Sequence, residues 1–371
     1  MTNRSHWPWV DRCKGLLILL VVLGHIVGTA GHCDSEPSRT LQFVFKVIYS
    51  FHMPAFFLMA GVTWRPAGAG TVREFAAFVG KKAQRLLVPY LVFGLGSIAA
   101  YLMFSGAAYD SYRTGDDYYL AKGGMSFVCC LKTFLCASGW PNGQGLEYNS
   151  VLWFLPSLFT LEVIYWAVDR FSPQRIVQLG VGVAAVALGW VVLHHELFYL
   201  PWGLGRLPMN LFYFLIGRWF VPLEDLSPAR RLRRVFPGVG LAIAAMLMGA
   251  VCWNVPDSWM CAYKIKWHLV YVGIAVCGGL MSVGVGRLVD SKLLVLLGGS
   301  SMGIMLTHKF VVVAGFKIPL VRGLCAGTLA EKALCVVVLT VLAVSLSTAV
   351  TRILKRWLPW TIGERWLYLK N

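Results

Sequence analysis

The stretch DRCKGLLILLVVLGH, residues 11–25, decides the fold of this chain. No charged residue stands between Lys14 and His25, so the segment is typical of a membrane-spanning helix with Lys14 at its edge. The offset of eleven residues is almost three turns, about 16 Å along the axis, and places both side chains on one face. An ionisable group at that depth faces a bundle interior or a water-filled cavity, which indicates function. The alternative is a histidine that only hydrogen-bonds a neighbouring helix.

The composition of the whole chain is that of a membrane protein. Hydrophobic residues make up 57% of the 371 residues and charged residues only 14%. We therefore expect an all-α fold, a polytopic transmembrane bundle of about ten helices that forms one membrane domain over residues 1–371. The expected spans are 15–31, 42–62, 86–104, 151–168, 176–193, 205–221, 236–253, 267–286, 293–312 and 332–351. No small-residue cleavage site follows the first span, which predicts a retained helix rather than a signal peptide.

The basic residues predict an orientation and argue against nucleic acid as a partner. The net charge is +17, but lysine and arginine do not form the single patch that nucleic-acid binding needs. They are dense before residue 15, in 65–85, in 230–234 and in 352–370, and sparser in the intervening loops. This is the positive-inside pattern, and it predicts that both termini are cytoplasmic.

The longest connection, residues 105–150, is predicted to lie outside the cytoplasm. It is rich in tyrosine, carries an apolar patch at 125–136 that is too short to span, and ends in a run of turn formers. A sugar-binding role and a role as a variable external loop both remain open. The ten cysteines show no metal-ligand spacing, so no metal site is predicted, and their pairing is left open.

Three further motifs place polar groups in or beside the expected spans. His52 lies mid-span, and Pro54 frees backbone groups next to it, as in helices that line a cavity. Arg85, at the cytoplasmic end of the third span, suits phosphate because a guanidinium fork matches phosphate oxygens; setting the topology is the simpler role. Ser301 and His308 are seven residues apart and therefore share one helical face.

Taken together, these motifs resemble the acyltransferase-3 family of bacterial integral membrane acyltransferases, especially its fucose 4-O-acetylase-like branch. The matching elements follow the family's order: Lys14-x10-His25, FHMPAFF at 51–57, RLLVPY at 85–90, LWFLP at 152–156 and Gly298-x2-Ser301-x6-His308. One departure is Leu158, where many relatives have a glutamate, and it puts in doubt whether Glu162 is the functional equivalent.

The resemblance implies an O-acyltransferase of the bacterial cytoplasmic membrane. It implies transfer of an acetyl or other short acyl group from cytoplasmic acyl-CoA to a hydroxyl of a carbohydrate or cell-envelope acceptor. Lys14 and His25 are the expected essential pair, and His52 and His308 are further candidate catalytic residues. Lys14 and Arg85 are the candidates for holding the phosphates of acetyl-CoA, which is a co-substrate; no permanently bound cofactor is expected.

Physical reasoning makes this implied reaction intelligible. A cationic mouth would hold the phosphates of CoA while the pantetheine arm runs inward, and the offset of about 16 Å along the helix suits such an arm. An imidazole at that depth stays neutral, as a general base or an acyl-accepting nucleophile requires, and both mechanisms remain open. The competing hypothesis is a transporter or flippase of an envelope precursor without chemistry. Such proteins usually have two related halves, which this sequence does not show.

Overall fold

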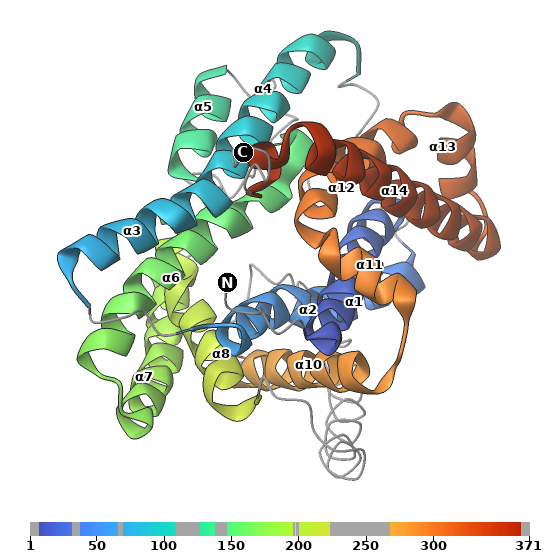
Figure 1. Cartoon of the computed structure of the whole chain (residues 1–371). Helices are drawn as coiled ribbons and strands as arrows, with labels where there is room; N and C mark the ends of the chain where they lie inside the picture. The colour runs from blue at the N-terminus through green and yellow to red at the C-terminus, as the bar shows by residue number, and fades with distance from the viewer. Residues whose placement is uncertain are drawn as a thin grey trace.

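The chain is helical throughout the part that can be described. The computed structural model describes residues 7–31, 38–65, 70–108, 127–137, 147–195, 197, 200–222 and 268–364. Within these ranges there is no strand, and the expected all-α class is confirmed. Figure 1 shows the arrangement. The helices are α1 (Pro8–Ala30), α2 (Arg39–Val62), α3 (Val72–Lys82), η1 (Ala83–Leu87), α4 (Val88–Ala108), α5 (Phe127–Cys136), η4 (Glu147–Trp153), α6 (Phe154–Phe171), α7 (Arg175–His194), η6 (Pro201–Arg206), α8 (Leu207–Phe220), α10 (His268–Leu288), α11 (Lys292–Gly299), α12 (Ser301–Phe316), α13 (Pro319–Cys325), α14 (Leu329–Trp357) and η8 (Pro359–Ile362).

Helices of membrane-spanning length recur along the described chain, so this is a multi-pass membrane protein. Seven of them are long and apolar enough to cross a bilayer, and the pair α11 and α12, bent by 82° at its break, makes an eighth if it is one span. The expected count of about ten is approximate. The helix α8 has 14 residues, fewer than the roughly 20 that a span needs, and the expected span 236–253 lies outside the described residues.

The first helix is the centre of the bundle, because it packs against α2, α10, α11, α12 and α14. In Figure 1 it lies between α2, α10 and α11. Its contact with α11 is close because both helices have glycine there. A Cβ on Gly15 would overlap the carbonyl oxygen of Leu294, and a Cβ on Gly298 would overlap that of Asp11. Small residues that let two backbones approach are the usual means of packing helices in a membrane.

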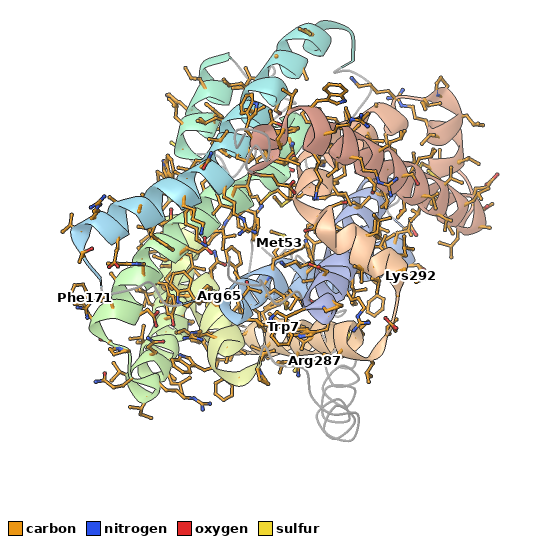
Figure 2. All side chains as sticks on the ribbon, in the orientation of Figure 1. Trp7, Met53, Arg65, Phe171, Arg287 and Lys292 are labelled. Carbon is orange, nitrogen blue, oxygen red and sulfur yellow. The ribbon has the colours of Figure 1, made fainter. Side chains whose placement is uncertain are left out.

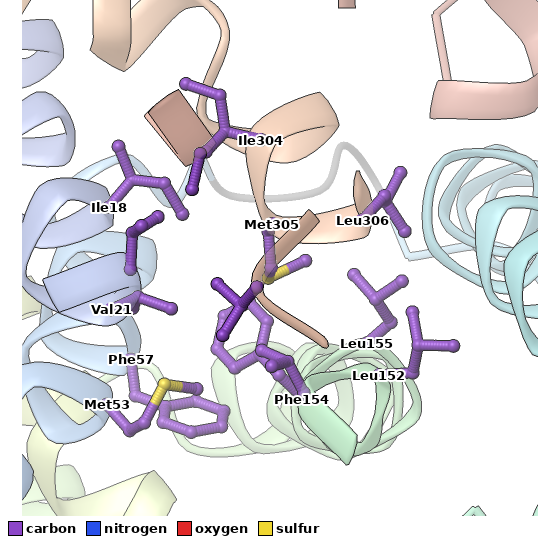
Figure 3. Close-up of a cluster of buried hydrophobic side chains, with 14 of the residues drawn as sticks. Ile18, Val21, Met53, Phe57, Leu152, Phe154, Leu155, Ile304, Met305 and Leu306 are labelled. Carbon is purple, nitrogen blue, oxygen red and sulfur yellow. The ribbon is translucent and has the colours of Figure 1, made fainter. Parts of the chain in front are cut away.

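A cluster of apolar side chains joins α1, α2, α12 and the start of α6. These side chains point toward one another in Figure 3, and most of them are fully buried. They are Ile18, Val21, Met53, Phe57, Leu152, Phe154, Leu155, Ile304, Met305 and Leu306. Met53 lies within the bundle in Figure 2, whereas Phe171, at the end of α6, and Lys292, at the start of α11, lie at its periphery. The outward face of α14 is apolar, as expected of a helix against lipid: Leu334, Val337, Val341, Leu342 and Leu346 are exposed.

The long connection at 105–150, which is predicted to be external, is described only in part. The apolar patch expected at 125–136 includes α5, a helix of 10 residues, which is too short to span a bilayer. This helix packs on α4: Tyr90 donates a hydrogen bond of 2.5 Å to the carbonyl of Phe134, and the two rings stack with centroids 5.3 Å apart. The tyrosine-rich part, 109–126, lies outside the described residues.

Candidate functional site

Three histidines from three helices meet one helical turn from the apolar cluster. The ring centroids of His25 on α1 and His308 on α12 are 5.5 Å apart. His52 on α2 approaches them through Tyr49, whose ring centroid lies 4.8 Å from that of His52 and 5.8 Å from that of His25. We call His25, Tyr49, His52 and His308 the histidine cluster. The sequence predicted its three histidines as candidate catalytic residues, and the structure brings them together.

The hydrogen bonds of His308 leave one ring nitrogen unused. Its Nδ1 donates to the carbonyl of Ile304 at 2.8 Å. Because a carbonyl only accepts, Nδ1 carries the proton in the neutral ring, and Nε2 is an acceptor. Nε2 is buried and has no hydrogen-bond partner among the described residues. His52 is held in the same way, with Nδ1 donating to the carbonyl of Ile48 at 2.8 Å. The backbone thus fixes the tautomer of both rings.

His25 is held by a side chain instead, which sequence reasoning missed. The hydroxyl of Tyr49 lies 2.9 Å from Nδ1 of His25. A phenol both donates and accepts, so this contact is compatible with either neutral tautomer of His25. Phe45 packs on the Tyr49 ring with a centroid separation of 3.9 Å. The signal in the sequence was a tyrosine one helical turn before His52 in an apolar span.

A lysine completes the surroundings of the cluster and was also missed. Lys309 follows His308 on α12 and lies within electrostatic range of both His25 and His308. It is half-buried. A lysine inside the expected span 293–312 was the available signal, because charged residues are rare in the interior of a membrane-spanning helix.

The predicted cationic pair also comes together, at the beginning of α1. Lys14 lies within electrostatic range of Asp11 and of Arg85. Lys14 is half-buried and Arg85 is exposed. Because α1 runs unbroken from Pro8 to Ala30, Lys14 and His25 are about 16 Å apart along one rigid axis.

A local break in the helical ladder positions Arg85. Pro89 has no N–H to donate to the carbonyl four residues earlier, which is that of Arg85, and the chain forms a π-helical turn, η1, at Ala83–Leu87. Gly363, after η8, packs against this carbonyl with φ +72°, and a Cβ there would overlap the oxygen. The segment after α14 therefore covers the freed carbonyl and fixes the backbone that carries Arg85.

Glu162 belongs to a different cluster. Its Oε1 accepts a hydrogen bond of 2.5 Å from Nζ of Lys82, which also lies 5.7 Å from the ring of Trp64 and 5.5 Å from that of Phe78. The indole of Trp64 donates to Asp169 at 3.0 Å. Glu162 is thus engaged by a lysine of α3 and takes no part in the contacts of the histidine cluster. Within the described ranges, no group of His, Cys, Asp or Glu has an arrangement that could hold a metal ion.

Comparisons with known proteins identify a family that covers most of the chain. A family profile described as an acyltransferase domain, Acyl_transf_3, matches residues 7–352. The matched region contains the histidine cluster, Lys14 and Arg85.

Two curated relatives match a shorter part of the chain. The nodulation protein NolL of Sinorhizobium fredii is 36% identical over 102 residues, which is 26% of this chain and 26% of the relative. The nodulation protein NolL of Mesorhizobium japonicum is 37% identical over 81 residues, 22% of this chain and 21% of the relative. The chain thus spans about a quarter of the length of these relatives. No solved structure matches it.

Proposed function

The chain belongs to the acyltransferase-3 family, and we propose that it is an O-acyltransferase that uses acyl-CoA. It moves an acetyl or other short acyl group from cytoplasmic acyl-CoA to a hydroxyl of a carbohydrate or another cell-envelope acceptor. The observation that carries this proposal is the histidine cluster, in which the buried Nε2 of His308 has no partner among the described residues. The cluster is joined by the unbroken helix α1 to the cationic pair, about three turns away.

The donor binds at the beginning of α1. Lys14 and Arg85 offer two cations to the phosphates of CoA, and the exposed position of Arg85 lets it meet a ligand that arrives from the cytoplasm. The guanidinium matches phosphate oxygens in a bidentate manner, whereas the ammonium acts as a point charge. The pantetheine arm then follows α1 inward and brings the thioester to His25.

The histidine cluster carries the proton. In direct transfer, the imidazole of His25 takes the proton of the acceptor hydroxyl while the oxygen attacks the thioester carbon. The C–S bond breaks, and the imidazolium returns the proton to the CoA thiolate, so the enzyme ends as it began. In the alternative route, His25 first forms an acyl-imidazole, which the hydroxyl then attacks. In both routes Lys309 stabilises the negative charge that develops on the carbonyl oxygen.

The contacts of the bundle agree with the proposed orientation. Lys355 near the end of α14 donates to the carbonyl of Gly299 at 2.8 Å, and Gly298 contacts Asp11. The beginning of α1 and the end of α14 therefore lie on one side of the bundle. In the proposed topology this side is the cytoplasmic face of the bacterial cytoplasmic membrane, as the distribution of basic residues predicts.

The proposal is tested by measuring CoA release and acetyl transfer with purified protein in lipid nanodiscs and radiolabelled acetyl-CoA. Wild-type protein is expected to release CoA and to label an envelope glycan fraction. His25→Ala is expected to lose about 10²–10⁴-fold in rate, the usual contribution of a general base. His195→Ala is the matched control, because His195 is exposed at the end of α7 and should change nothing. A well-folded His25→Ala protein with full activity would exclude the catalytic role, and a wild type that moves the glycan without acylating it would favour a flippase.

A further inference from the structure

In the part of the chain that the structure describes, three buried polar side chains outside the histidine cluster have atoms without hydrogen-bond partners, and one of them contacts α12, the helix of His308. Within the described residues, Asn149 Oδ1, Ser157 Oγ and Asn210 Nδ2 make no hydrogen bond, like His308 Nε2. The exposed fractions of Asn149, Ser157 and Asn210 are 0%, 2% and 7%. A buried polar group left unpaired destabilises a fold, so each one requires an explanation such as a bound molecule.

The contacts of these three side chains place them on adjoining elements. The Asn149 amide donates to the carbonyl of Leu306 at 2.8 Å, two residues before His308. The hydroxyl of Ser157 lies directly against Gly203 of η6, where a Cβ would overlap it. Asn210 is in the first turn of α8, the helix that follows η6. The start of α6 and the start of α8 therefore present their polar atoms to one region.

A planar pair of side chains joins the two elements. The guanidinium carbon of Arg206 lies 4.2 Å from the ring centroid of Trp153, a close cation–π contact. Ser157 lies one helical turn after Trp153 on α6, Asn149 lies at the kink in η4 four residues before it, and Asn210 lies one turn after Arg206 on α8, so the pair is close in the chain to all three unpaired atoms. The chain reaches Arg206 through two left-handed residues, Trp202 (φ 56°) and Gly203 (φ 73°). A non-glycine residue in this region is strained, and such strain persists where structure around it enforces it.

We name Asn149, Trp153, Ser157, Arg206 and Asn210 the polar seam. Its three unpaired atoms comprise an acceptor on Asn149, a donor on Asn210, and a hydroxyl on Ser157 that does both. A phosphate or carboxylate only accepts and would leave the Asn149 oxygen unpaired, whereas a sugar hydroxyl both donates and accepts. Aromatic surface with a few polar groups is also the usual lining of a small-molecule site, and the cation of the seam, Arg206, is already engaged by the ring of Trp153.

We propose that the polar seam binds a neutral, hydroxyl-rich sugar. Its identification as the acceptor rests on the proposed function. The hydrogen bond from Asn149 to α12 sets the seam two residues from His308, so a hydroxyl of the bound sugar can reach the histidine cluster. The seam thereby supplies what the cluster lacks, a means of holding the acceptor rather than the donor.

Sugar binding is tested under conditions where no acyl transfer can occur, with methyl α-L-fucopyranoside as the probe. The sugar is titrated into purified protein without acetyl-CoA, and thermal unfolding is followed, since a ligand of the native state raises the unfolding temperature. Asn210→Leu and Ser157→Ala remove unpaired groups and should fold at least as well as wild type. Each is expected to weaken sugar binding about tenfold, the effect of one hydrogen bond. Ser347→Ala is the matched control, because its buried hydroxyl on α14 is also unpaired among the described residues but lies away from the seam.

Kinetics then separates this inference from the proposed function. With radiolabelled acetyl-CoA, the seam variants should raise KM for the glycoside, whereas the control Ser347→Ala should keep both the wild-type KM and the slow hydrolysis of acetyl-CoA. Two results would overturn the seam as a sugar site. One is equal sugar binding by wild type, Asn210→Leu and Ser157→Ala. The other is a wild type whose unfolding temperature is raised neither by the fucoside nor by the corresponding glucoside and galactoside. Sugar binding that depends on the seam, in a protein that never cleaves acetyl-CoA, would uphold the seam and refute the proposed function.

A second, independent observation concerns two cysteines. The Sγ atoms of Cys325, at the end of α13, and Cys335, on α14, are 3.0 Å apart, and both residues are buried. The connection between α12 and α14 is external in the topology that the basic residues predict. Thiols in an oxidising compartment pair when their geometry permits. We infer that Cys325 and Cys335 form a disulfide in the cell envelope.

The bond forms by thiol–disulfide exchange during folding, before the pair is buried. The two thiols lose two protons and two electrons to the disulfide of an envelope oxidoreductase, which is reduced to two thiols as the new S–S bond forms. To test this, membranes are solubilised in detergent that contains N-ethylmaleimide to block free thiols. The masses of the tryptic peptides are then measured by mass spectrometry before and after reduction. The expected result is a linked pair without maleimide adducts, whereas Cys277, buried on α10 and free, is alkylated after denaturation. Full alkylation of Cys325 and Cys335 without reductant would overturn the inference.

Discussion

Two polar clusters lie inside this bundle, and they differ in how completely their hydrogen bonds are made. In the cluster around Lys82, Glu162 and Asp169, each charged group meets a partner: the ion pair is 2.5 Å long, and Trp64 donates to Asp169 at 3.0 Å. Nearby, Gln178 accepts from Tyr165 at 2.7 Å and from Trp219 at 2.9 Å. In the histidine cluster, a buried ring nitrogen of His308 has no partner among the described residues.

The contrast suggests how to recognise function among buried polar groups. A saturated cluster connects helices, here α3, α6 and α2, because removing one member leaves another unpaired. An unsaturated cluster gains little stability from its polar atoms, and it retains capacity for a substrate. The first should therefore govern stability and the second activity. The following predictions test that division, from the largest expected kinetic effect to the smallest.

Removing the unpaired nitrogen should abolish most of the activity and leave a protein that still folds. His308→Ala is expected to lower turnover by about 10²-fold or more, as loss of an acid–base group does. Some stability should be lost, because the change removes a fully buried ring and its Nδ1 bond to Ile304, but Nε2 itself made no hydrogen bond among the described residues. Acetyl transfer per folded protein, with folding judged by gel filtration and circular dichroism, measures both. An unfolded His308→Ala protein would erase the distinction between the two clusters.

The cationic pair should act on donor binding rather than on turnover. Lys14→Ala is expected to raise KM for acetyl-CoA by one to two orders of magnitude, because a charged hydrogen bond contributes about 1.5–3 kcal/mol. Lys14→Arg should keep more function than Lys14→Ala, since attraction to the phosphates depends on the positive charge more than on the geometry of the side chain. Added salt should weaken donor binding to the wild type, because a mouth open to water is partly screened. Unchanged donor affinity with collapsed turnover would instead assign Lys14 to the chemistry.

The contact between Tyr49 and His25 should contribute a smaller share. Tyr49→Phe removes one hydroxyl and keeps the ring, so turnover is expected to fall about threefold to tenfold, as for a single hydrogen bond. The pH profile of the variant's turnover should shift, because His25 loses the hydroxyl that contacts its Nδ1. Phe45→Leu is the control, since Phe45 packs on the same ring without a polar group. An identical loss in both variants would mean that Tyr49 acts by packing alone.

The saturated cluster should respond in the opposite way. Glu162→Gln is expected to lower the free energy of unfolding by about 1.5–3 kcal/mol, since it removes a charged hydrogen bond from a mostly buried pair. Turnover per folded protein should stay within about twofold of wild type, because this change lies outside the reacting groups. Asp290→Asn is the control: Asp290 pairs with Arg12 at 2.5 Å but is 94% exposed, so little change follows. A large loss of turnover at unchanged stability would instead show that Glu162 takes part in catalysis.

The sequence predicted those features that depend on one helix at a time. The apolar spans, the expected one-face alignment of Lys14 and His25, and the burial of His52 and His308 follow from composition and helical period. Tyr49, Lys309, the Lys82–Glu162 pair and the Trp153–Arg206 stack depend on how helices rotate and cross. Lys82 and Glu162 are 80 residues apart, and no local pattern records that contact. The 82° bend after α11 was hidden because its two halves together resemble one ordinary span.

The short helix α11 also has a consequence for the order in which the protein is made. Its eight residues are too few to be stable alone or to span a bilayer, so it needs α1 as its support. Yet 278 positions separate Arg12 on α1 from its partner Asp290 just before α11. The ribosome therefore delivers the supporting helix α1 long before the helix α11 that packs on it. A nascent chain therefore carries the α11-facing surface of α1, including Gly15, uncovered until Leu294 has been made, and the region around Lys14 is completed only then.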